Sequence, residues 1–257
     1  DAEYVNSNFI IMCTKDGTIK KTRLEAYSRP RQNGVNAIVI REGDQLIEAK
    51  LTSGNAEVMI AARDGKAIRF NESTVRPIGR VGAGVRGISI EDGDEVVGMI
   101  CVEKDRKEDI LVVSEHGYGK RTLVSEYQRK GRGIRGVITI STKERNGRMV
   151  SAVLTDPDDE IMMLTTGGKV VRTSASEVSI VNRAAMGVRL INPGDDTLAS
   201  VRRVAVKSAD DELEKLNIEV SDEDLLVDED PADDESETPE TDSDNAVDVD
   251  GDDQDQN

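Results

Sequence analysis

The sequence predicts an all-β protein, built as a propeller-like array of four-stranded blades and followed by a disordered acidic tail. Apolar runs of five to seven residues rich in Val and Ile, bounded by Gly and Asp, are typical of strands. Up to Lys207, no segment shows a helical period over ten or more residues. The same order of runs recurs four times, and four strands per unit at about 40 to 50 residues is typical of propeller blades.

The clearest copy of the repeat lies between Glu57 and Val102. It contains the apolar run EVMIAA, a turn at Asp64-Gly65, the basic strand KAIRF and the loop NESTVRPIGRVGA. Two further strand-like runs, GVRGISI and EVVGMICVE, are joined by an acidic turn. A blade of this size has too little core alone, so we expect neighbouring blades to stack.

The other copies follow the same order. The first has FIIMCT, IKKT, GVNAIVI and QLIEAKLT, the third DILVVS, GKRT, GIRGVITI and RMVSAVLT, and the fourth EIMMLT, KVVRT, GVRLI and LASVRRV. A hairpin glycine recurs at Gly17, Gly65, Gly117 and Gly168, and a later glycine at Gly34, Gly84, Gly133 and Gly187. We expect blades over about 9–52, 57–103, 109–155 and 160–204, within a domain of residues 1–207.

The formal net charge of −17 hides two opposed segments. Residues 208–257 hold 23 acids and one base, which leaves 33 bases and 28 acids in residues 1–207. The acidic segment cannot bury enough apolar surface to offset the entropy of ordering, so we expect it to be mostly disordered. Such asymmetry points to nucleic-acid contact combined with an acidic tail.

The motifs that could indicate nucleotide binding or catalysis lack the structural context that this chemistry needs. Two GxGxxG matches, at residues 82–87 and 131–136, are each followed by a strand, whereas dinucleotide binding needs a helix there. The only histidine, His116, falls in a hairpin turn. We therefore expect no catalytic residue, no metal site and no cofactor in this chain.

The sequence has neither a signal-like start nor an apolar run of about 20 residues, so we expect a soluble domain. Because the first residue is not Met, we expect a piece of a longer or processed chain.

One basic residue recurs four positions after each hairpin glycine: Lys21, Arg69, Arg121 and Arg172. These recurring cations, with basic residues near them, predict a curved surface that follows the phosphates of DNA. The alternative is that they are ordinary solvent-facing residues. The aromatic content of 2% argues against base stacking. The expected DNA contacts are Lys20, Lys21, Arg23, Arg29, Arg31, Lys66, Arg69, Arg76, Arg80, Arg86, Lys120, Arg121, Arg129, Lys130, Arg132, Arg135, Lys169, Arg172, Arg183 and Arg189.

Several stretches resemble a known family: DGTIKKT, GKAIRFNESTVRPIG, HGYGKRTLVSEY and EIMMLTTGGKVVRTSASEVSIV. Over about residues 8–206 the chain resembles the C-terminal β-pinwheel domains of DNA gyrase A proteins, in their later blades and acidic tail. The resemblance implies blades that exchange a strand and wrap duplex DNA around their outer edge. Residues 128–133, QRKGRG, resemble the family's wrapping box but are one residue shorter.

For the whole enzyme, the resemblance implies a type IIA topoisomerase of the bacterial cytoplasm that introduces negative supercoils. ATP and Mg are used by the other kind of subunit, in a heterotetramer of two A and two B subunits. The family's catalytic tyrosine follows an arginine, whereas Tyr4, Tyr27, Tyr118 and Tyr127 do not. Two alternatives are the matching C-terminal domain of topoisomerase IV and a protein-binding β-propeller. We also expect the acidic tail to modulate wrapping by competing with DNA for basic residues.

Overall fold

The computed structural model describes residues 2–30, 32–103 and 108–204, and these are nearly all strand and connecting loop. The regular helical elements are α1 (Ala2–Ser7) and the 3-10 turns η1 (Leu24–Tyr27), η2 (Glu72–Thr74), η3 (Val124–Glu126) and η4 (Ala175–Glu177). No helix in this part of the chain is long and apolar enough to cross a membrane. The all-β expectation is confirmed. Contacts divide the chain into units of residues 1–207 and 208–257, and the expected disorder of the second lies outside the described residues.

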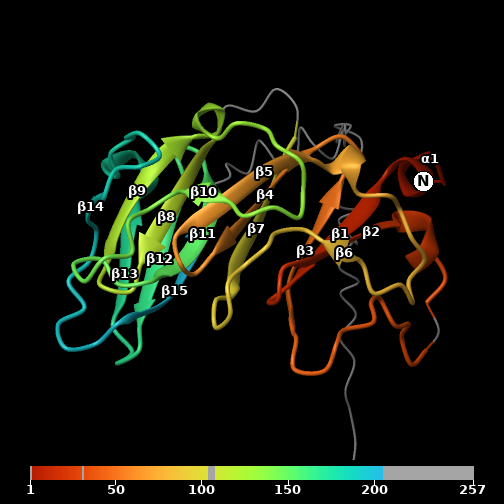
Figure 1. Cartoon of the computed structure of the whole chain (residues 1–257), viewed down its shortest axis with the longest axis horizontal. Coiled ribbons are helices and arrows are strands. Elements are labelled where there is room, and N and C mark those ends of the chain that lie inside the picture. Colours follow the sequence, from red (N-terminus) through yellow and green to blue (C-terminus); the bar gives the residue numbers. More distant parts are fainter. Residues whose placement is uncertain (1, 31, 104–107, 205–257) are drawn as a thin grey trace, which may run out of the picture. The chain divides into compact units, whose positions relative to one another are not determined.

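Each repeat forms the centre of one antiparallel sheet (Figure 1). The first has the order β3-β1-β2-β6, from Leu46–Thr52, Phe9–Thr14, Thr18–Arg23 and Val85–Arg86. The second has β10-β5-β4-β7, from Val137–Ile138, Lys66–Asn71, Glu57–Ala62 and Val96–Val102. The third has β11-β8-β9-β14, from Met149–Thr155, Asp109–Ser114, Tyr118–Leu123 and Val188–Arg189. The fourth has three strands, β13-β12-β15, from Val170–Ser174, Glu160–Thr165 and Leu198–Val204.

The short edge strand of each complete sheet is donated by the following repeat. β6 of the second repeat pairs with β2, β10 of the third with β5, and β14 of the fourth with β9. The strand exchange that the family resemblance implies is therefore confirmed. The fourth sheet receives no such strand from the described residues, and Val170 on its edge strand β13 is 56% exposed.

The strand register corrects one repeat position. We expected Gly133 to match Gly84 and Gly187, but Gly136 directly precedes the donated strand β10. The backbone hydrogen bonds agree with this assignment. The carbonyl of Gly65 accepts from the Thr139 N–H, and the carbonyl of Gly117 accepts from the Leu190 N–H at the equivalent position. The expectation for Gly133 was wrong. This glycine, with a positive φ of 78°, forms a bend within the loop and does not adjoin the donated strand.

The core lies between successive sheets, because the central strands bury both faces. In β4, Val58 and Ile60 belong to a cluster shared with the first sheet, whereas Met59 and Ala61 belong to a cluster shared with the third. Alternate side chains of a strand point to opposite faces, so a strand packed on both sides reads as a continuous apolar run. This packing explains why EVMIAA has no polar alternation.

The hairpin glycines allow the donated segment to approach closely. Gly117 has φ +78°, and a Cβ there would lie 2.2 Å from the carbonyl oxygen of Ile191. The equivalent distance from Gly65 to the Ile140 oxygen is 2.4 Å. Gly168 has φ +85° but open space around it, since no segment of the described residues packs on it. Positive φ and close approach both require glycine at the first two positions, and only positive φ does at Gly168.

Replacing these glycines by alanine is expected to separate the two requirements. Gly168→Ala carries only the left-handed backbone cost of about 1–2 kcal/mol in the free energy of unfolding. Gly117→Ala adds a steric clash against Ile191, for a further cost of about 1–3 kcal/mol. Urea denaturation followed by circular dichroism measures both. Equal losses in the two variants would contradict the close approach of the donated segment.

Candidate nucleic-acid interface

The recurring cations are mostly inside the protein. Lys21 is 3% exposed and Arg121 is 5% exposed, and the side chain of Arg69 is 18% exposed. Only the side chain of Arg172, in the last repeat, reaches 57%. The expectation that these residues line a solvent-facing rim is therefore wrong for Lys21, Arg69 and Arg121.

Each recurring cation is neutralised by an acid of the protein. Glu57 begins β4 and lies 2.9 Å from Arg69, and Asp109 begins β8 and lies 3.3 Å from Arg121. Glu160, at the start of β12, pairs with Arg172 in the same way. The first repeat has Phe9 at this strand position. There the Lys21 Nζ lies 4.3 Å from the Phe9 ring centroid and 3.2 Å from Glu72 of the second repeat.

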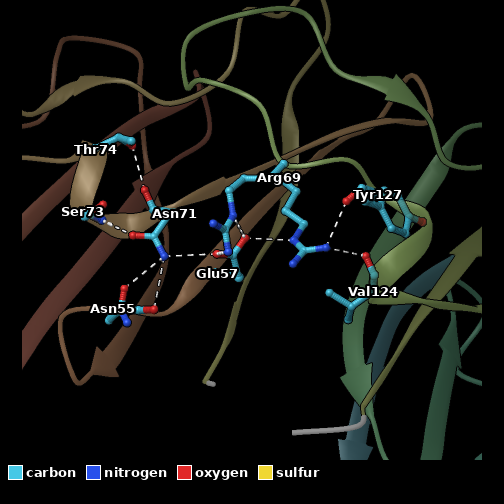
Figure 2. Close-up of polar contacts among 9 residues, drawn as sticks. Asn55, Glu57, Arg69, Asn71, Ser73, Thr74, Val124 and Tyr127 are labelled. Carbon is cyan, nitrogen blue, oxygen red and sulfur yellow. Dashed lines mark hydrogen bonds and ion pairs between the residues drawn. The ribbon is translucent and has the colours of Figure 1, made fainter. Parts of the chain in front are cut away.

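The recurring cations also hold the connection that follows. We define the crossing loops as residues 72–84, 124–136 and 175–187, which run to the donated strands. Arg69 Nη1 donates to the Val124 and Tyr127 carbonyls at 2.9 and 3.0 Å (Figure 2). Arg121 Nε donates to the Val178 carbonyl at 2.9 Å. Charged donors satisfy carbonyls strongly, so these side chains anchor one repeat to the next.

The backbone repeats the same anchor. The carbonyl of Arg69 accepts from the Lys130 N–H at 2.8 Å, and that of Arg121 accepts from the Val181 N–H at 2.9 Å. In the first repeat, the Lys21 carbonyl accepts from the Ile78 N–H at 2.9 Å. The three crossing loops are thus fixed by both the side chain and the main chain of the recurring cation before them.

Glu57 is the centre of the best-developed anchor (Figure 2). Burial would raise its pKa, but hydrogen bonds from Asn71, Arg129 and Arg69 outweigh burial and hold the pKa below its usual range. Arg129 belongs to the third repeat, and its Nε donates to Glu57 Oε2 at 3.1 Å. One carboxylate therefore joins its own hairpin to the crossing loop of the next repeat.

This anchor predicts a pH dependence. The folded-state pKa of Glu57 lies below the unfolded value of 4.5, so its contribution is fully present above about pH 4.5 and is lost as pH falls through the folded pKa. Glu57→Gln is expected to cost about 1–3 kcal/mol at neutral pH. It should also show a smaller loss of unfolding free energy between pH 5 and pH 3 than the parent. Parallel curves of stability against pH would rule out this role for Glu57.

Lys20 and Lys120 are also unavailable to DNA, since each is 0% exposed. The Lys20 Nζ donates to the Ala37 and Arg80 carbonyls, and the Lys120 Nζ donates to those of Asn182 and Arg183. Burial, with the nearby Arg183, lowers the pKa of Lys120 to about 8. The expectation of surface contacts is wrong for both, because their ammonium groups satisfy loop carbonyls.

The remaining expected contacts fall into several groups. Lys66 and Arg135 share Glu91 at 3.0 and 3.4 Å, and Arg129 pairs with Glu57. Arg23, Arg29 and Lys169 are exposed, and Arg31 lies outside the described residues. Seven cations, here called the loop cations, are exposed or half-exposed and have no acidic partner among the described residues. They lie on the crossing loops and donated strands: Arg76, Arg80, Arg86, Lys130, Arg132, Arg183 and Arg189.

The loop cations therefore form the candidate interface with an anionic partner. Arg132 shows how two loops are joined there, because its Nε donates to the Thr74 carbonyl and its Nη1 donates to the Arg86 carbonyl. Sequence reasoning missed Arg145 and Lys143, which are also exposed without an acidic partner in the described part of the chain. A signal was present: the turn at Glu91–Glu95 is acidic, whereas the matching turn at Lys143–Arg148 is basic.

Two features of the described ranges concern a metal site and a candidate nucleophile, Cys13. No group of three His, Cys, Asp or Glu side chains there is placed to hold a metal ion. Cys13 is buried, and burial, with Asp44 and Glu48 nearby, raises the pKa of its thiol to about 12. That thiol is protonated at neutral pH and is a poor nucleophile.

Comparison with known proteins identifies a matching family. The family described as DNA gyrase C-terminal domain, beta-propeller, matches residues 8–53, 56–103, 108–156 and 159–205. The DNA gyrase A protein of Salmonella typhimurium is 44% identical over 226 residues, which cover 87% of this chain and 26% of that protein. The DNA gyrase A protein of Staphylococcus aureus (strain MRSA252) is 40% identical, over 84% of this chain and 24% of that protein. The chain thus spans about a quarter of the length of these curated relatives.

Solved structures show the same fold. A DNA gyrase A C-terminal domain aligns with a TM-score of 0.69 and 27% identity, over 80% of this chain and 68% of that one. The C-terminal domain of a DNA topoisomerase IV aligns with a TM-score of 0.75 and 24% identity, over 82% of this chain and 66% of that one. At that identity, the topoisomerase IV match supports the fold alone.

Proposed function

Because this chain belongs to the DNA gyrase C-terminal domain family of β-propellers, we propose that it binds duplex DNA through the loop cations and wraps it along the blades. One observation carries the proposal: Lys21, Arg69 and Arg121 are neutralised by acids inside the protein, whereas the seven loop cations have no acidic partner among the described residues. Free surface arginines and lysines attract phosphates irrespective of base sequence.

The position of the loop cations favours contact with more than one blade. Each crossing loop leaves its own repeat and ends as a strand in the sheet before it. A phosphate backbone that meets successive loops therefore meets successive blades. Contacts of this kind bend DNA at a cost set by its deformability and not by its base sequence.

In the complete protein we propose the role that the relatives' names imply, as part of a DNA gyrase that supercoils DNA in the bacterial cytoplasm. Strand cleavage, ATP and Mg would be handled by other parts of a heterotetramer of two A and two B subunits. This chain would contribute binding and wrapping.

Substitution of loop cations tests the proposal. Arg76, Arg86 and Lys130 changed together to Gln should reduce the slope of log K against log salt for a linear duplex by about 3, since each phosphate contact contributes about 0.9. Arg172→Gln is the matched control: it is exposed but already paired with Glu160, so the slope should stay unchanged. A parent protein that fails to bind duplex DNA would refute the proposal and leave a protein-binding propeller.

The acidic tail gives a second test. Residues 208–257 carry 23 acids tethered to a basic body, so they compete with DNA at high effective concentration. A chain truncated after Lys207 should bind linear duplex more tightly than the full chain at low salt, and the difference should shrink as salt screens the attraction. Isothermal titration at two salt concentrations measures both. Equal affinities at low salt would exclude competition by the tail.

A further inference from the structure

One turn reverses its charge in the third repeat. The turn between the donated segment and the last strand carries four acids in the second repeat, at Glu91–Glu95. The third repeat has Lys143–Arg148 there, with three bases and one acid. In the second repeat Glu91 neutralises Lys66 and Arg135. In the third repeat Arg148 lies 4.0 Å from Asp64, whereas Lys143 and Arg145 have no acidic partner among the described residues.

This basic turn meets the donated strand β14 at Tyr118. The Cζ of Arg145 lies 4.3 Å from the centroid of the Tyr118 ring, and the Cζ of Arg189 lies 5.0 Å from it. Arg189 Nη2 also donates to Tyr118 Oη at 2.6 Å. Both arginines are exposed, and neither has an acidic partner in the described part of the chain. Hydrogen bonds from Arg189, and then from Arg145, lower the pKa of Tyr118.

The arrangement is fixed by a buried amide. Asn146 Nδ2 donates to the Ser141 carbonyl at 2.8 Å and to the Met186 carbonyl at 2.9 Å. Asn146 adjoins Arg145, and Met186 lies just before the strand that carries Arg189. The two arginines therefore come from different repeats, and the Asn146 side chain ties the backbone beside Arg145 to the backbone just before β14.

Two cations over one ring repel each other. Cation–π attraction holds each guanidinium in place without neutralising its charge. A group that could neutralise both is a phosphate, which guanidinium donors bind in bidentate geometry. Preorganisation by Asn146 and Tyr118 reduces the entropy lost when an anion binds.

We propose that Arg145 and Arg189, held over Tyr118, form a phosphate-binding site that grips the DNA backbone at the third blade. The inference rests on the proposed function and adds Arg145, Tyr118 and Asn146 to it. The site is composite, because it is complete only when the fourth repeat has donated β14 to the third sheet.

The matching positions of the other repeats lack this arrangement. The first sheet has Arg86 paired opposite Thr18, and the matching turn of the first repeat contains Glu42 and Asp44. The second has Ile138 paired opposite Lys66, with Glu91 beside it. The third blade therefore combines an aromatic platform with two arginines that have no acidic partner among the described residues.

The test uses the full chain and a linear duplex of mixed sequence. Arg145→Gln with Arg189→Gln should reduce the slope of log K against log salt by about 2, with weaker binding at low salt. The control is Arg41→Gln with Arg202→Gln, which removes two exposed cations without acidic partners among the described residues and should leave the slope unchanged. A slope equal to the parent's in the first variant would overturn this site while leaving the proposed function in place. A parent that binds no duplex would overturn both.

A second readout tests the geometry without DNA. Spectrophotometric titration, taken as the difference between the parent and Tyr118→Phe, reports the phenol of Tyr118. In the variant lacking Arg145 and Arg189 the pKa of Tyr118 should rise, because the hydrogen bonds that lower it are gone. An unchanged tyrosine titration would show that the two arginines do not lie at Tyr118 and would overturn the proposal.

Discussion

The anchor between a strand-borne cation and the next crossing loop is the interaction on which the rest of the structure depends. A guanidinium such as that of Arg121 is buried, and a buried charge is costly unless it is paired and hydrogen-bonded. Asp109 supplies the pairing, and the Val178 carbonyl supplies part of the hydrogen bonding. The charge is therefore satisfied only when the following repeat is in place, which makes each blade depend on its successor.

Strand donation and the core follow from this dependence. The anchored crossing loop leads into a segment that hydrogen-bonds to the hairpin glycine of the preceding repeat. There the donated strand completes the sheet. The completed sheets bury both faces of β4 and β8 between neighbours. The fourth repeat shows the same parts without a successor among the described residues: Arg172 keeps Glu160 but holds no loop carbonyl, and Gly168 has open space. The hairpin glycine and the acid–cation pair are of the same kind, so the difference lies in the successor, which the described residues do not supply.

Much of the fold could be predicted from sequence, because strand-length apolar runs and hairpin glycines are local signals. The role of Lys21, Arg69 and Arg121 could not, because recurrence at one repeat position shows only that every blade needs the residue. Whether a recurring cation faces phosphate or a loop carbonyl depends on its burial, which is a tertiary property. Arg145 was missed because a single turn, read without its neighbours, does not show that it lies over Tyr118.

The recurring cations and the loop cations have different roles. This difference explains how one chain can be both a stacked β array and a candidate polyanion-binding protein. Positive charge that holds the blades together is cancelled inside the protein, as at Glu57 and Arg69, and contributes little field at the surface. Charge on the crossing loops is not needed for sheet pairing, since the donated strands pair through the backbone. Loop positions outside the anchors, unlike Arg129, can therefore gain or lose arginines without loss of the fold, as the acidic and basic versions of one turn in the second and third repeats illustrate. Function on this scaffold is accordingly set by the loops, while the strands and their buried cations fix where those loops lie.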